Sequence, residues 1–207
     1  MAEWWDKYKD FSLKDENFQR ILDFFLFHCP SEIEKVNKKK GTKTYSKVSK
    51  RAETLRTKGW TGGYLNTLLA SMKHTSSGQL EYYTFNAAVE IEKEVKALEK
   101  DTSMRDKHFE MIVFMERSDM SKTSAIFYYI RNAFAHGSFS IINTNGKKVY
   151  YLESDKDGIV KAQIRLREET LLNWIKTFRL SPAALKKALE DGRKQRKSID
   201  RKKGDAA

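Results

Sequence analysis

The chain has 207 residues, a formal net charge of +12 at pH 7 and a hydrophobic share of 40%. This length suits one domain with a buried core, or one domain with a tail. No apolar run reaches the roughly 18 to 20 residues that a membrane span needs, and the first residues carry charges where a signal peptide is apolar. We therefore expect a cytoplasmic protein with no membrane partner.

Composition also limits the fold class and the chemistry. Only two prolines and ten glycines occur, and 33% of the residues are charged, which favours a mainly helical protein. Cys29 is the only cysteine, so a disulfide or a cysteine zinc site within one chain is excluded. The histidines at positions 28, 74, 108 and 136 are too scattered to form a recognisable metal motif. We expect no metal site and no cofactor.

The positive charge is concentrated in two segments. Residues 35–58 hold ten basic side chains and one acidic one, and residues 186–207 hold nine basic and four acidic ones. Such clusters suit a phosphate polymer, because each neutralised phosphate releases counterions. The competing interpretation is a solvated surface with a frayed tail. The predicted RNA contacts are Lys38, Lys39, Lys40, Lys43, Lys47, Arg51, Arg193, Lys194, Arg196 and Lys197.

Helical spacing of apolar residues recurs along the first two thirds of the chain. The stretches are 18–25, 65–72, 87–98, 109–113 and 121–135. Stripes of this kind are usually core, so we expect a helical bundle. Residues 31–64, between the first two stretches, are predicted to be a hinge or mobile loop. The glycines of "KGWTGGY" in that loop lack the ending of a phosphate-binding loop, which argues against a nucleoside triphosphatase.

After Gly137 the pattern changes to strands. "SFSIIN" and "KKVYYLES" flank "TNGK", and an Asn-Gly pair in this setting predicts a β-hairpin. The turn "DKDG" then leads into "IVKAQIRLR", whose alternation predicts a half-buried strand with a basic outer face. Helical spacing resumes at 168–178, and Ser181 is the predicted N-cap of one last helix.

These elements predict a mainly α fold. We expect a helical domain over residues 1–180, in which residues 138–167 form a small inserted antiparallel hairpin or meander. Residues 181–207 are expected to form a C-terminal helix and a basic tail.

The stretch "YYIRNAFAHGSF", residues 128–139, carries the main functional signal. Arg131 and His136 lie five positions apart at the end of the predicted helix, and Gly137 can adopt the left-handed conformation that ends it. In the last turn, the negative end of the helix dipole favours a protonated imidazole. The simpler alternative is a histidine that caps the helix and an arginine at the surface.

This stretch resembles the signature of the HEPN superfamily, in which an arginine, a polar residue and a histidine occur in this order. Here Arg131, Asn132 and His136 match, and the segment from Ser121 to Phe178 resembles a bacterial branch of the family. The resemblance implies a helical bundle and a metal-independent ribonuclease whose homodimer places two motifs in one cleft. It also implies a toxin–antitoxin, abortive-infection or antiviral setting, with an antitoxin or a regulatory RNA as a further partner.

The spacing of the motif is compatible with such a composite site. Five residues of an ideal helix advance about 7.5 Å and turn about 140°, so Arg131 and His136 do not share one face. A two-fold dimer would present both residues twice. Two copies of His136 could then act as base and acid when the ribose 2′-OH attacks the phosphate. Arg131 would hold the phosphate, and Asn132 could orient an imidazole ring or a phosphate oxygen. The products would be a 2′,3′-cyclic phosphate and a 5′-OH.

Two other functions stay open from the sequence. One is a catalytically inactive RNA-binding or regulatory module of the HEPN type, and the other is a protein-interaction scaffold. His28 beside Cys29 is interpreted as packing, because neighbouring residues on a helix point about 100° apart and no orienting acid is evident.

Overall fold

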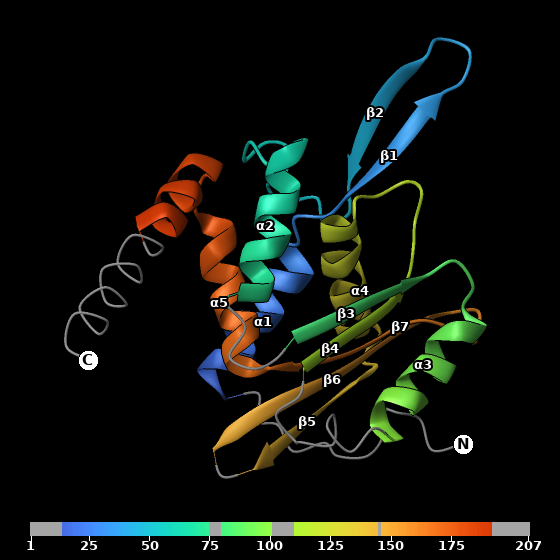
Figure 1. Cartoon of the computed structure of the whole chain (residues 1–207), viewed down its shortest axis with the longest axis vertical. Coiled ribbons are helices and arrows are strands. Elements are labelled where there is room, and N and C mark those ends of the chain that lie inside the picture. The colour runs from blue at the N-terminus through green and yellow to red at the C-terminus, as the bar shows by residue number, and fades with distance from the viewer. Residues whose placement is uncertain (1–13, 75–79, 101–109, 145, 192–207) are drawn as a thin grey trace, which may run out of the picture.

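The computed structural model describes residues 14–74, 80–100, 110–144 and 146–191 (Figure 1). These residues form a five-stranded mixed sheet with helices on both faces, and a separate two-stranded hairpin. A last helix without a label covers residues 182–191. In chain order the labelled elements are α1 (Glu16–Phe27), β1 (Glu32–Asn37), β2 (Thr42–Lys47), α2 (Gly63–His74), β3 (Leu80–Phe85), α3 (Val89–Lys100), β4 (Glu110–Met115), α4 (Lys122–His136), β5 (Phe139–Thr144), β6 (Lys147–Lys156), β7 (Ile159–Arg167) and α5 (Glu168–Arg179).

The main sheet has the strand order β3-β4-β7-β6-β5. Strands β3 and β4 run parallel and are connected through α3, as a parallel pair requires a crossover. The other neighbours are antiparallel. The predicted Asn-Gly hairpin between β5 and β6 is confirmed, with Gly146 at φ +76°, and so is the turn before β7, where Gly158 has φ +73°.

The fold is therefore α+β, and the predicted mainly α helical bundle is wrong. The main cause is the stretch 109–113, which was predicted to be helical, whereas residues 110–115 form β4. Five of its six residues are buried, and its side chains enter two different hydrophobic clusters on opposite faces. A strand covered on both faces shows no alternation, so periodicity cannot distinguish it from a buried helix. With β3 and β4 added, the predicted small meander becomes part of a five-stranded sheet.

The sheet separates two hydrophobic clusters. Helices α1, α2, α4 and α5 lie on one face and enclose the larger cluster, while α3 covers part of the other face (Figure 1). The outer face of β7 was predicted to be basic and solvated. Instead, α3 packs against β7, and Gln163 is buried and donates to Glu153 over 2.7 Å.

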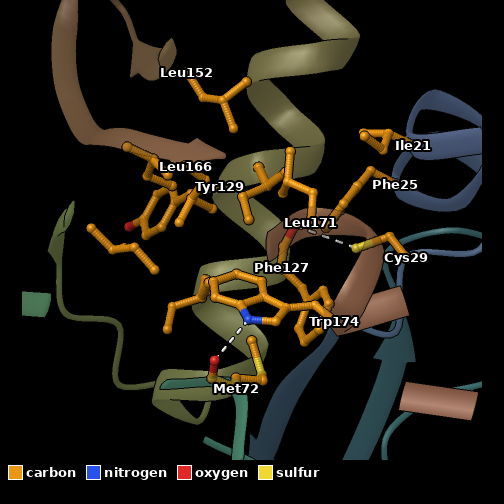
Figure 2. Close-up of a cluster of buried hydrophobic side chains, with 14 of the residues drawn as sticks. Ile21, Phe25, Cys29, Met72, Phe127, Tyr129, Leu152, Leu166, Leu171 and Trp174 are labelled. Atoms are coloured by element: carbon orange, nitrogen blue, oxygen red, sulfur yellow. Dashed lines mark hydrogen bonds between the residues drawn. The ribbon is translucent and has the colours of Figure 1, made fainter. Parts of the chain in front are cut away.

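The larger cluster has an aromatic centre, part of which Figure 2 shows. Phe127 of α4 is fully buried, with its ring 5.9 Å from that of Phe25 and 6.4 Å from that of Trp174. The indole N–H of Trp174 donates to the carbonyl of Met72 over 2.9 Å, which connects α5 to α2. These contacts hold α4 against its neighbours and thereby fix where its open side lies.

Residues 31–64 also differ from the prediction of a mobile loop. The hairpin of β1 and β2 extends away from the body of the protein (Figure 1). After it, Leu55 and Trp60 are buried, each with 1% of its surface exposed. The hairpin is mostly polar, so its strands lack the apolar face by which sequence patterns identify strands.

Candidate functional site

Helix α4 carries the candidate motif at its C-terminal end. Its first turn is capped by Ser121, whose hydroxyl accepts from the N–H of Ser124. It ends at His136, because Gly137 adopts the left-handed conformation (φ +71°) and its N–H donates to the carbonyls of Ala133 and Phe134. The predicted helix end is therefore confirmed.

Most of α4 is buried, and one strip of it is open. We call the half-buried or exposed residues Tyr128, Arg131, Asn132, Ala135 and His136 the open stripe. Their steps of three, one, three and one positions spread them over about 140° of the helix surface, with Arg131 and His136 at the two edges. The other residues from Thr123 to Phe134 are buried. A ligand or a second protein chain can reach the second half of α4 only along this stripe.

Arg131 is incompletely satisfied in this stripe. Its Nη1 donates to Oδ1 of Asn132 over 3.3 Å, whereas its Nε is buried without a hydrogen-bond partner. Among the residues that the structure describes, Arg131 forms no ion pair. A buried donor without an acceptor costs about 1–3 kcal/mol and calls for an explanation. The Nε has no exposed surface, so a ligand on the stripe would contact other atoms of this half-buried side chain.

His136 is exposed at the opposite edge of the stripe. The regular helix between it and Arg131 gives the separation of about 140° expected for five residues. No hydrogen bond joins these two side chains, both of which are described. Within one chain, the three motif residues therefore lie on one open surface of α4, but their side chains do not meet at one point.

Cys29 and His28 do not form a catalytic pair. Cys29 is fully buried, and its Sγ lies 3.5 Å from the carbonyl oxygen of Phe127 (Figure 2). Burial raises the pKa of this thiol, so it stays protonated at neutral pH. His28 is exposed and lies 3.7 Å from Asp23. The burial of Cys29 agrees with the predicted packing role.

The predicted RNA contacts in the hairpin fall into two groups. Lys38, Lys39 and Lys40 form an exposed tip, where the side chain of Asn37 accepts from the backbone N–H groups of Lys39 and Lys40. Lys43, by contrast, is paired with Glu34 at 2.8 Å, which raises the pKa of Lys43 and lowers that of Glu34. The three tip lysines have no carboxylate partner among the described residues.

The remaining predicted contacts lie elsewhere. Lys47 is exposed at the end of β2, and Arg51 is exposed in the turn that follows. Arg193, Lys194, Arg196 and Lys197 lie outside the described residues.

The hairpin tip and the motif lie at opposite ends of α4. The hairpin is attached near the start of this helix, where the hydroxyl of Ser31 donates to the carbonyl of Ser124 over 2.6 Å. Ser124 precedes His136 by twelve residues, which is about 18 Å of helix. From this attachment the hairpin extends away from the sheet (Figure 1). One chain therefore does not bring Lys38–Lys40 to the motif.

Sequence reasoning predicted Arg51 as an RNA contact but missed the group of basic residues to which it belongs. They line a cleft of about 390 Å³ that does not include the motif. We call it the basic cleft. It is built from α1, the turns after β2 and the end of α5, so no short sequence pattern contains it. Its lining residues are Arg20, Asp23, Phe24, His28, Arg51, Glu53, Lys58, Phe178 and Arg179.

Comparison of the chain with protein-family models, with curated proteins and with solved structures finds no match. In the described residues, no helix is both long and apolar enough to cross a membrane. The same part of the chain holds no group of three or more His, Cys, Asp or Glu side chains arranged to bind a metal ion.

Proposed function

We propose that this chain is a metal-independent endoribonuclease whose site residues are Arg131 and His136, which act in catalysis, and Asn132, which positions Arg131. The observation that carries the proposal is the half-buried guanidinium group of Arg131, which forms no ion pair with any residue that the structure describes and lies on the same open stripe as His136. A phosphate oxygen would accept a charge-assisted hydrogen bond from this guanidinium group. The exposed imidazole of His136, at the end of the stripe, supplies a side chain that can take or give a proton in general acid–base catalysis.

In the proposed reaction, the ribose 2′-oxygen attacks the adjacent phosphorus and the bond from phosphorus to the 5′-oxygen breaks. His136 takes the proton of the 2′-OH, and the partner's His136 gives a proton to the departing 5′-oxygen. Arg131 stabilises the negative charge that develops on the non-bridging oxygens. Positioned proton transfer of this kind typically contributes about 10²- to 10⁴-fold to a rate. The products are a 2′,3′-cyclic phosphate and a 5′-OH.

The proposal includes a homodimer. One chain offers a single histidine at the edge of the stripe, whereas the reaction needs a base and an acid on opposite sides of the phosphate. A two-fold axis beside the open stripe would duplicate Arg131 and His136 around one phosphate. Ala135 and His136 are exposed at the end of the stripe and would form part of that contact.

The resemblance to the HEPN superfamily supports this proposal through the motif and its helix alone. The helical bundle that the resemblance implied is replaced by an α+β fold, so similarity of the whole fold adds nothing here. On the same ground we propose a cytoplasmic location and a toxin–antitoxin or antiviral setting. We also propose that an antitoxin or a regulatory RNA restrains the enzyme.

A second candidate is an RNA-binding or regulatory module without catalysis. The hairpin tip favours it, because Lys38–Lys40 are exposed and have no carboxylate partner among the described residues. Such a tip adds salt-sensitive affinity for any phosphate backbone. It offers no group that could transfer a proton near neutral pH.

One experiment separates these candidates. Purified wild type, His136→Ala, Arg131→Ala and a control, Lys122→Ala, are incubated in EDTA with labelled single-stranded RNA and with DNA of the same sequence. Lys122 is exposed on the same helix but lies outside the open stripe. The ribonuclease proposal expects RNA cleavage by wild type and the control, loss of about 100-fold or more in the two motif variants, and intact DNA. RNA that all four proteins bind and leave intact would favour the binding module.

A further inference from the structure

We propose that the basic cleft binds the terminal phosphate of a nucleotide, either free or at the end of an RNA strand. This site is separate from the motif and does not depend on the proposed ribonuclease activity. It draws cationic side chains from three segments far apart in sequence: Arg20 from α1, Arg51 and Lys58 from the turns after β2, and Arg179 from the last residue of α5.

The cleft carries more positive than negative charge, because three arginines and one lysine line it beside two carboxylates. Glu53 lies 2.5 Å from Lys58, whereas Asp23 lies 3.7 Å from His28, which carries a positive charge only when it is protonated. Arg20, Arg51 and Arg179 form no ion pair with any residue that the structure describes. Three guanidinium groups outside any ion pair therefore line one cleft, in excess over its carboxylates.

Their chemistry matches a phosphomonoester. A guanidinium group offers paired N–H donors in a planar fork that fits phosphate oxygens. A terminal phosphate carries about −1.5 to −2 charges at pH 7 and three strong acceptor oxygens, whereas a phosphate within a strand carries one negative charge. Three unpaired arginines thus suit a terminal phosphate better than an internal one.

Two buried aromatic side chains also line the cleft. They are Phe24 and Phe178, whose rings meet edge to face with centroids 5.8 Å apart. The ammonium group of Lys58 lies 5.9 Å from the centroid of Phe178. Apolar lining of this kind excludes water locally and strengthens the attraction between the arginines and an anion. The volume of about 390 Å³ falls in the range of small-molecule sites and has room for one nucleotide.

The test uses short single-stranded oligonucleotides with 2′-O-methyl riboses, which lack the 2′-OH nucleophile and cannot be cut by the proposed mechanism. One oligonucleotide carries a 5′-phosphate and the other a 5′-OH, and AMP serves as the free nucleotide. Their affinities are measured by titration calorimetry for wild type, Arg20→Ala/Arg179→Ala and Lys176→Ala/Lys187→Ala. The two double variants remove equal charge, and all four residues are exposed, so folding should be retained.

Wild type and the lysine variant are expected to bind the 5′-phosphorylated strand at least about tenfold more tightly than the 5′-OH strand, and the arginine variant is expected to lose that preference. If AMP competes with the phosphorylated strand, the cleft takes the free nucleotide; if it does not, the strand end is the ligand. The proposal is overturned if wild type shows no preference for the phosphate and does not bind AMP. It is also overturned if both double variants lose the preference equally, because bulk charge would then explain the binding.

Discussion

The side chains of Arg131 and Asn132 are joined, since Nη1 of the arginine donates to Oδ1 of the amide over 3.3 Å. This contact uses one side of the guanidinium and leaves the buried Nε without a partner. Asn132 therefore holds one end of the guanidinium group in place. In the proposed enzyme it is a positioning residue for Arg131.

Replacing Asn132 by alanine should lower the cleavage rate without unfolding the protein. We expect kcat to fall by about 10- to 100-fold, because a misplaced catalytic group costs this much. Thermal unfolding should change little, since Asn132 is only half-buried. Single-turnover kinetics with RNA, beside a melting curve, checks both points. An Asn132→Ala protein with the wild-type rate would remove this residue from the site.

The hairpin tip should contribute affinity that depends on salt. Changing Lys38, Lys39 and Lys40 together to glutamine is expected to weaken RNA binding and to lower the slope of log K against log salt by about 2, because each lost phosphate contact removes about 0.7 for a single strand. The matched control changes Lys93, Lys96 and Lys100 of α3, on the other side of the sheet. Equal losses in both variants, measured by fluorescence anisotropy at several salt concentrations, would show that the tip has no special role.

Position 137 should require glycine because of its backbone conformation, and not because a side chain there would meet other atoms. A Cβ at this position would meet no atom within 4 Å, but φ is +71°, where L residues are strained. We expect Gly137→Ala to lower the free energy of unfolding by about 1 kcal/mol in urea titrations. Gly63→Ala is the control, since Gly63 also has open space and lacks a positive φ. Equal effects in the two variants would contradict the role of the left-handed cap.

The ion pair of Lys148 with Asp15 should make stability depend on pH. Lys148 and the N–H of Phe18 hold the pKa of Asp15 below its usual value of 3.8, and Asp15 raises the pKa of Lys148 above 10.5. The lowered pKa of Asp15 stabilises the folded state above about pH 3.8, and this contribution is lost as the pH falls through the pKa that Asp15 has in the folded protein. The raised pKa of Lys148 stabilises the folded state below about pH 10.5, and this contribution is lost as the pH rises through the pKa that Lys148 has in the folded protein.

Asp15→Asn isolates this ion pair, because the amide oxygen can still accept from Phe18 and cap α1. Lys148 also keeps Glu168, 3.4 Å away. The variant should lose about 1 kcal/mol of unfolding free energy at pH 7 and less at pH 3, where Asp15 of the wild type is more protonated. A loss of the same size at both pH values, measured by urea titration, would assign the effect to the cap instead.

The elements that sequence patterns predicted are those with one buried face. Helices α1, α4 and α5 have apolar stripes, and β5 and β6 are joined by an Asn-Gly turn, so local residues sufficed. Strand β4 was not predicted, because α3 covers one of its faces and the larger cluster covers the other. This burial on both faces depends on the tertiary structure and leaves no alternation in the sequence. Predicting it as a helix removed the sheet, and with it the correct fold class.

The candidate site was predictable to a similar extent. The three motif residues lie within six positions of one helix, so their common open stripe follows from local geometry. The buried Nε of Arg131 depends on packing around α4 and could not be read from the sequence. The basic cleft combines Arg20, Arg51 and Arg179, which become neighbours only when α1, the turns after β2 and the end of α5 meet.

The central claim is that His136 transfers protons in a metal-independent cleavage of RNA. It is tested most directly by mapping the ends of RNA fragments made in EDTA by wild type and by His136→Ala. Wild type should produce fragments with 2′,3′-cyclic phosphate and 5′-OH ends, and the variant should produce none. Fragments with 3′-OH and 5′-phosphate ends, or equal cleavage by both proteins, would contradict it.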